Sequence, residues 1–166
     1  AMKKICSLLL IKLFFVSVVF CQNNRNPVKR VSLLNAHPAW IMQGNIYEVN
    51  VRQYTKEGTF NAFSKHLNRL KAMGVQTLWF MPINPISKLD RKGTLGSYYA
   101  VSDYTSTNPE VGTLADWKNL VKKIHALGMK VIIDWVRNHT GADHVWVTAH
   151  PEFFIKDSTG KPAVPF

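Results

Sequence analysis

Residues 130–139, with the sequence KVIIDWVRNH, decide the fold class of this chain. The apolar, largely β-branched run at 130–135 predicts a buried strand. Asp134 lies at the end of this strand, and Asn138 and His139 follow in the next loop. A carboxylate, an amide and an imidazole at one strand end are able to bind sugar hydroxyls or a cation. A turn-capping aspartate and a surface histidine are the alternative interpretation, and the residue types alone leave both open.

Two further strands and two helices precede this stretch. Alternating or continuous apolar residues predict the strands, and apolar residues spaced three and four apart predict the helices. The second helix begins after Thr113, which forms a capping-box pattern with Asp116, and it ends before Gly128. In chain order, the predicted elements are strand 46–52, helix 60–74, strand 75–82, helix 114–127 and strand 130–135.

The alternation of strands and helices implies a parallel sheet with right-handed crossovers. A doubly wound sheet and the beginning of a (β/α)8 barrel both satisfy this order. Residues 53–58, after the first strand, hold a single glycine, which is not the pattern of a dinucleotide-binding turn. The long segment 83–112 lies where barrel enzymes build their sites. This segment favours the beginning of a (β/α)8 barrel, while the order of the elements alone leaves the doubly wound sheet open.

The N-terminus has the pattern of a targeting segment. Residues 1–21 combine a basic start at Lys3 and Lys4 with a short apolar run, and we interpret them as a signal peptide cleaved after Cys21. Residues 22–44 are predicted to form a linker. The protein is therefore expected to be secreted or periplasmic, with no membrane contact after cleavage. The alternative is an anchor, through an uncleaved helix or a lipid on Cys21, as in an unrelated membrane-tethered α/β protein.

Charge and cysteine content exclude other classes of protein. The formal net charge is +11, but six basic residues precede the first acidic residue, Glu48, and the 15 basic and 10 acidic residues from there onward are scattered. No basic stripe is present that could follow a phosphate backbone, so we expect no nucleic-acid partner. Both cysteines lie within the first 21 residues, which excludes a disulfide further along the chain.

The segment before the second helix carries a cluster of candidate binding residues, namely Tyr98, Tyr99, Asp103 and Tyr104. Sugars stack on such rings, but tyrosines also anchor long loops by packing, and composition alone favours the packing role. A later group fits no zinc-ligand spacing and is interpreted as packing and loop residues: His144, Trp146 and His150.

Four segments in this order resemble the alpha-amylase superfamily, glycoside hydrolase family 13. They are IYEVNVRQYT at 46–55, GVQTLWFMPI at 74–83, GSYYAVSDYTSTNPEVGT at 96–113 and DWVRNH at 134–139. The resemblance covers about residues 45–165. It implies an α/β fold, an incomplete (β/α)8 TIM barrel with about three β-strands and two α-helices. Residues 45–139 would form the N-terminal part of the catalytic barrel, and residues 140–166 would begin the domain inserted after strand three.

The resemblance also implies roles for individual residues. Tyr99 would line the sugar subsite next to the cleaved bond, His139 would contact the same sugar, and Asp134 would help to organise the catalytic centre. Asn138 would bind a structural calcium ion, together with further oxygen ligands. The implied partner is an α-glucan or a maltooligosaccharide with α-glucosidic bonds, as in starch.

The residues that would break the bond are not expected in this stretch. Retaining glycosidases need two carboxyl groups about 5–5.5 Å apart, and the family places them after strands four and five. We assign no role to the remaining acids, Asp143, Glu152 and Asp157. The segment alone is therefore expected to be inactive, marginally stable and prone to aggregation. A non-catalytic carbohydrate-binding remnant is the alternative function.

Overall fold

The computed structural model describes residues 37–42 and 44–163. The predicted signal peptide and most of the predicted linker lie outside the described residues. The chain forms two compact units, Ala1–Met42 and Gln43–Phe166. In the first, the 3-10 helix η2 spans Ala39–Ile41. All elements described below belong to the second unit, and no helix within the described residues is long and apolar enough to cross a membrane.

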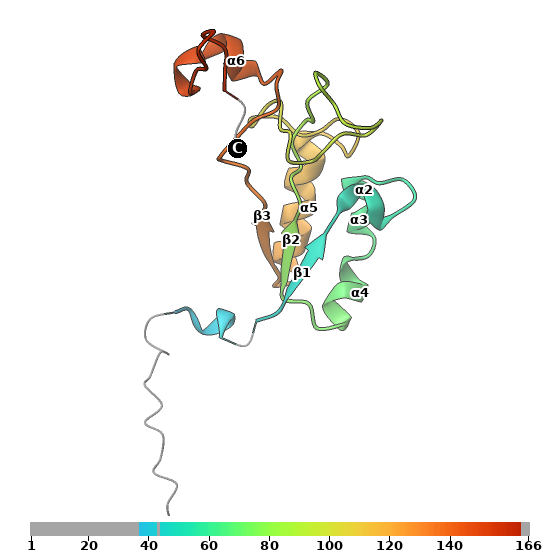
Figure 1. Ribbon diagram of the computed structural model, residues 1–166. Coiled ribbons are helices and arrows are strands. Elements are labelled where there is room, and N and C mark those ends of the chain that lie inside the picture. Colours follow the sequence, from blue (N-terminus) through green and yellow to red (C-terminus); the bar gives the residue numbers. More distant parts are fainter. Residues whose placement is uncertain (1–36, 43, 164–166) are drawn as a thin grey trace, which may run out of the picture. The chain divides into compact units, whose positions relative to one another are not determined.

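Three parallel strands form the sheet of the second unit, as predicted (Figure 1). They are β1 (Ile46–Val49), β2 (Thr77–Phe80) and β3 (Lys130–Ile133), in the order β1-β2-β3. Their first residues pair in register, Ile46 with Thr77 and Thr77 with Lys130. The central strand is the most deeply buried, which agrees with its almost unbroken apolar sequence.

Three helices build the core against this sheet: α3 (Phe60–Ser64), α4 (Leu67–Ala72) and α5 (Leu114–Ala126). Figure 1 shows α5 behind the strands, and α3 and α4 beside β1. Phe80 of β2 lies between the helices, with its ring centroid 5.5 Å from that of Phe63 and 5.0 Å from that of Trp117. Both pairs have the edge-to-face geometry that aromatic rings prefer.

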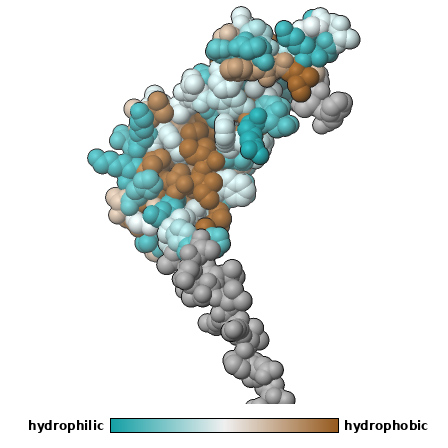
Figure 2. Space-filling view, turned by 90° about the vertical axis from the view of Figure 1, so that its left-hand side faces the viewer, coloured by the Kyte–Doolittle hydropathy of each residue, from teal (hydrophilic) through white to brown (hydrophobic). Residues whose placement is uncertain are grey.

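The β3 side of the sheet remains exposed. Ile132 is 41% exposed, Ile133 44% and Trp135 69%. Figure 2 views the molecule from this side and shows an apolar patch over the sheet. Exposed apolar side chains next to an unpaired strand edge favour association with other chains.

All three strands are shorter than predicted, since the second was expected at 75–82 and the third at 130–135. The first strand is the one that changes into a different element. It ends at Val49, and residues Val51–Tyr54 form a short helix, α2, instead of continuing the strand to residue 52. The carbonyl of Asn50 accepts a hydrogen bond from the Gln53 amide at 3.1 Å, which starts the turn. Val51 is buried in α2, as it was expected to be in a longer strand, so its apolar side chain did not distinguish a helix from a strand at this position.

The first predicted helix is divided into α3 and α4. The amides of Lys65 and His66 donate to the carbonyls of Ala62 and Phe63, three residues back, which tightens the backbone between the two helices. The second predicted helix is correct. Thr113 and Asp116 form both hydrogen bonds of the capping box at the start of α5.

Two short elements after β3 were not predicted: α6 (Val145–Ala149) and the 3-10 helix η3 (Pro151–Phe153). His144 caps α6, because its Nδ1 accepts a hydrogen bond from the Trp146 amide at 3.0 Å. Elements of this length span about one turn, too short for an apolar periodicity to be visible in the sequence.

Candidate functional site

The candidate site lies at the carboxyl ends of the strands. Two segments meet there: residues 81–113, called the β2–α5 loop, and residues 134–144, called the β3 loop. Figure 1 shows both at the same end of the sheet. Parallel strands place their carboxyl ends on one edge, so loops far apart in sequence are brought together.

Tyr99 and Asp134 are in direct contact across the two loops. The Tyr99 hydroxyl donates a hydrogen bond to Asp134 Oδ2 at 2.9 Å. This bond, together with partial burial and the charges of Asp134 and Glu48, raises the pKa of the Tyr99 phenol. The phenol therefore stays protonated at neutral pH and remains a donor. Tyr99 is 38% exposed, which leaves part of its ring open to a ligand.

His139 and Asn138 lie further along the β3 loop. His139 is half-buried and Asn138 is exposed. Within the described residues, neither side chain makes a hydrogen bond or an ion pair. The structure thus brings together Tyr99 and Asp134 of the predicted set, and places the other two in the loop of Asp134 without a hydrogen bond to either member of that pair.

The donor atoms around Asn138 do not make a calcium site by themselves. Calcium takes six to eight oxygen ligands, and Asn138 supplies one. Between residues 37 and 163, the described part of the chain holds no group of three or more His, Cys, Asp or Glu side chains that could bind a metal. We therefore derive no step of the function through calcium.

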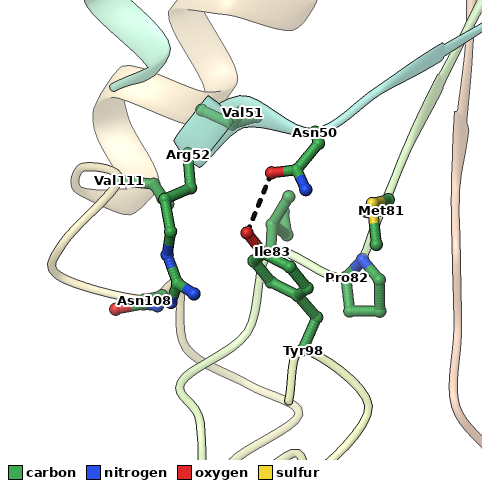
Figure 3. Close-up of a pocket in the computed structure, with 9 residues that line it drawn as sticks. All are labelled: Asn50, Val51, Arg52, Met81, Pro82, Ile83, Tyr98, Asn108 and Val111. Atoms are coloured by element: carbon green, nitrogen blue, oxygen red, sulfur yellow. Dashed lines mark hydrogen bonds between the residues drawn. The ribbon is translucent and has the colours of Figure 1, made fainter. Parts of the chain in front are cut away.

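Tyr98 has an anchoring role (Figure 3). Its hydroxyl donates to Asn50 Oδ1 at 2.9 Å, and the Arg52 guanidinium lies 4.5 Å from its ring centroid. Arg52 Nη2 also bonds Glu110 at 3.1 Å. A small pocket lies beside these residues, lined by Asn50, Val51, Arg52, Met81, Pro82, Ile83, Tyr98, Asn108 and Val111. Its enclosed space fits about one water molecule, so it is not a sugar subsite.

Tyr104 is a second anchor, between the two loops. Its hydroxyl faces the backbone carbonyls of Val136 and of His139, the latter at 2.9 Å. Burial raises the pKa of the Tyr104 phenol, so it too remains a donor. The ring packs on His144, with the centroids 4.8 Å apart. His144 is 1% exposed, which agrees with the packing role predicted for it.

Side chains that the sequence did not single out hold the β2–α5 loop. The Asn84 amide donates to the carbonyls of residues 103, 104 and 106. Arg91 donates to the carbonyls of Ser87 and Ile86 at 2.8 and 2.9 Å. Asp143, to which the sequence gave no role, accepts from backbone amides of this loop. All these partners lie within irregular backbone, for which no periodic sequence signal exists.

Comparison with known protein families identifies the family of this chain. Residues 23–161 match the family described as alpha amylase, catalytic domain. The chain belongs to this family. The expected resemblance to the alpha-amylase superfamily is thereby confirmed, and so is the fold class, a part of an alpha-amylase TIM barrel with three parallel strands.

Three relatives illustrate the similarity. The alpha-amylase SusG of Bacteroides thetaiotaomicron is 38% identical over 91 residues, which are 55% of this chain and 12% of that protein. An oligo-1,6-glucosidase of Halalkalibacterium halodurans is 32% identical over 112 residues, 64% of this chain and 19% of that protein. The crystal structure of an alpha-amylase from Lactobacillus plantarum superposes with a TM-score of 0.72 at 49% identity, over 74% of this chain and 29% of that one.

This chain spans a small part of the length of these relatives. It is a 166-residue portion of an alpha-amylase-family glycoside hydrolase domain. The activities for which these relatives are named are therefore those of proteins much longer than the matched segment.

Proposed function

We propose that the protein to which this chain belongs acts on α-glucosidic bonds of starch-like glucans, by hydrolysis or transfer. The names of two relatives, an alpha-amylase and an oligo-1,6-glucosidase, support a glucan or maltooligosaccharide substrate. The proposed contribution of this segment is to hold one sugar ring, with Tyr99, Asp134 and His139 as the binding residues.

The contact between Tyr99 and Asp134 carries this proposal. A phenol that donates to a carboxylate at 2.9 Å fixes both groups at the mouth of the loops. The partly exposed ring of Tyr99 offers an apolar face for a sugar, and the other lone pairs of the carboxylate are able to accept hydroxyl hydrogens. The imidazole of His139, which has no partner among the described residues, supplies a further polar group in the same loop.

Bond cleavage by this segment alone is not supported. Two of the acids near the site have their oxygens committed to the loops themselves. Asp103 accepts from the Thr105 amide at 2.8 Å, and Asp143 accepts from the Lys88 amide at 2.8 Å. A retaining glycosidase needs a pair of carboxyl groups free for acid/base and nucleophilic roles. This observation favours, as a second candidate, a segment that binds carbohydrate without cutting it.

Calorimetric titration of the chain with a maltooligosaccharide tests the proposal. We expect heat of binding from the chain, a loss of it in Tyr99→Ala, and its retention in Tyr98→Phe, which keeps the neighbouring ring and removes an anchoring hydroxyl. Equal heats from Tyr99→Ala and from the unchanged chain would contradict the proposed site. If the purified chain released reducing ends from starch, the statement that this segment alone does not cleave glucosidic bonds would be wrong.

Two further expectations remain proposals. We propose export of the protein through the N-terminal segment, on the basis of its basic start and apolar run, and sequencing of the mature N-terminus checks it. We also propose that Asn138 joins a calcium site completed by oxygen ligands other than those described. Titration of the protein with Ca²⁺, compared with Asn138→Ala, checks that expectation.

A further inference from the structure

The β2–α5 loop and the β3 loop are joined by backbone hydrogen bonds. The Gly141 amide donates to the Val101 carbonyl at 2.7 Å, and the Val145 amide donates to the Ser102 carbonyl at 3.0 Å. The accepting residues, Val101 and Ser102, follow Tyr99 by two and three positions in the chain. The position of the Tyr99 backbone is therefore coupled to the segment that follows β3.

Asp143 adds a carboxylate to this junction. Its Oδ2 accepts the backbone amides of Lys88 at 2.8 Å and of Leu89 at 3.0 Å. The Ser87 hydroxyl donates to the Leu89 carbonyl at 3.0 Å, which closes the same turn. Hydrogen bonds to an ionised acceptor are stronger than those between neutral groups. One side chain of the β3 loop thus holds two consecutive residues of the β2–α5 loop.

The turn held by Asp143 is paired with the backbone next to Tyr99. The Ser87 amide donates to the Ala100 carbonyl at 2.7 Å, within an antiparallel bridge of Ile86 with Val101. A shift of residues 87–89 therefore moves the backbone of Ala100. Among the described residues, the Tyr99 ring has no aromatic partner, so its placement comes from this backbone and from the hydrogen bond of its hydroxyl to Asp134.

The packing beside Asp143 is tight. A Cβ atom built on Gly141 would lie 2.3 Å from Ser87 Cβ and 3.0 Å from the Ala100 carbonyl oxygen. Arg91 also bonds the turn, at the carbonyls of Ser87 and Ile86. However, Arg91 belongs to the same loop as Tyr99 and is unable to fix that loop relative to β3. Asp143, on the segment that follows β3, is able to do so.

We propose that Asp143 is a positioning residue for Tyr99: by holding residues 87–89 against the β3 loop, its carboxylate sets the Tyr99 hydroxyl within hydrogen-bonding distance of Asp134. The consequence for sugar binding rests on the proposed function, but the positioning itself does not. Asp143 touches neither Tyr99 nor Asp134 and acts through the backbone between residues 87 and 100.

Nuclear magnetic resonance of the full chain, labelled with ¹³C at the tyrosine Cζ atoms, tests this inference. The chain has five tyrosines, and Tyr99→Phe identifies the Tyr99 resonance by its disappearance. Asp134→Ala gives the reference position of that resonance without its carboxylate partner. We expect Asp143→Ala to move the Tyr99 resonance towards this reference, and to leave the resonance of Tyr54, on the helical side, in place. Asp143→Asn, which keeps a carbonyl oxygen able to accept both amides, is expected to keep the Tyr99 resonance near its original position.

Asp157→Ala is the matched control. Asp157 accepts the backbone amides of Thr159 at 2.8 Å and Lys161 at 3.1 Å, but only within its own turn. Its removal is expected to leave the Tyr99 resonance unchanged. An unchanged Tyr99 resonance in folded Asp143→Ala would overturn the inference.

If Asp143→Ala does not fold, Asp143→Glu decides the question. This variant keeps the charge and displaces the carboxylate by one methylene. A shifted Tyr99 resonance supports the inference, and an unshifted one overturns it. A chain that binds no maltooligosaccharide but shows the shift refutes the proposed function and supports the positioning role of Asp143.

Discussion

Replacing Tyr104 with phenylalanine removes one hydroxyl from the junction of the two loops. That hydroxyl carries a single hydrogen and faces the carbonyls of Val136 and His139. Its removal leaves these carbonyls against the edge of an apolar ring. An unsatisfied polar group costs about 1–3 kcal/mol when it is fully buried, whereas these bonds are partly buried and carbonyls tolerate partial satisfaction better than amides do. We therefore expect Tyr104→Phe to lower the free energy of unfolding by about 1–2 kcal/mol.

Tyr99→Phe is the matched comparison, because it removes the same atoms from a more exposed position. The Tyr99 side chain is 38% exposed, so water replaces much of the lost hydrogen bond to Asp134. We expect a loss below about 0.5 kcal/mol, at the low end for hydrogen bonds.

Urea unfolding, followed by tryptophan fluorescence, measures the difference between these variants. With a slope of about 2 kcal/mol per molar urea, the Tyr104→Phe midpoint should fall by about 0.5–1 M and the Tyr99→Phe midpoint by less than about 0.25 M. An unaltered slope would show that the change lies in stability. If Tyr99→Phe lowers the midpoint as much as Tyr104→Phe does, the distinction between an anchoring and a ligand-facing tyrosine is wrong.

Three other perturbations have defined outcomes. Gly141→Ala should lower the free energy of unfolding by about 1–3 kcal/mol, because the new Cβ would overlap Ser87; a urea midpoint equal to that of the parent chain would show that the loop relaxes freely. Burial alone would raise the pKa of Asp143, but hydrogen bonds, among them those from the backbone amides of Lys88 and Leu89, outweigh it and hold the pKa below its ordinary value. The stabilisation by Asp143 is therefore fully present above the unfolded pKa of about 4, and it is lost as the pH falls through the lower pKa of the folded chain. When the pH is lowered below about 4, the urea concentration at the unfolding midpoint should decrease, and it should decrease less in Asp143→Asn. Trp135→Lys should reduce light scattering of the concentrated chain, because it places a charge on the exposed apolar side of the sheet, whereas undiminished scattering would locate the association elsewhere.

Helix α5 illustrates what local sequence patterns determine. Thr113 and Asp116 cap it as predicted, and its apolar stripe, including Trp117, faces the core. These signals act within a few residues. The break between α3 and α4 was not predictable in the same way. Phe60 and Leu70 are buried on either side of the break, so the apolar stripe continues across it. Such a stripe indicates which face of a helix is buried, but it does not indicate where the backbone hydrogen-bond pattern changes.

The site could be predicted only in part. Composition favoured a packing role for the tyrosines, and the contacts of Tyr98 and Tyr104 agree with it. The resemblance to the alpha-amylase superfamily pointed to Tyr99 and Asp134, which the structure brings into contact. Nothing in the sequence indicated Asp143, because its partners are backbone amides, which every residue except proline carries.

The hydrogen bond between Asp143 and the Lys88 amide joins positions 55 residues apart. During translation, the turn around Lys88 is made 55 residues ahead of its carboxylate partner. At a synthesis rate of about 5–20 residues per second, this separation amounts to roughly 3–11 s. Over that interval the turn, with its exposed Leu89, lacks the carboxylate that holds it in the folded chain, so the loop that later presents Tyr99 is completed only after the β3 loop has been made.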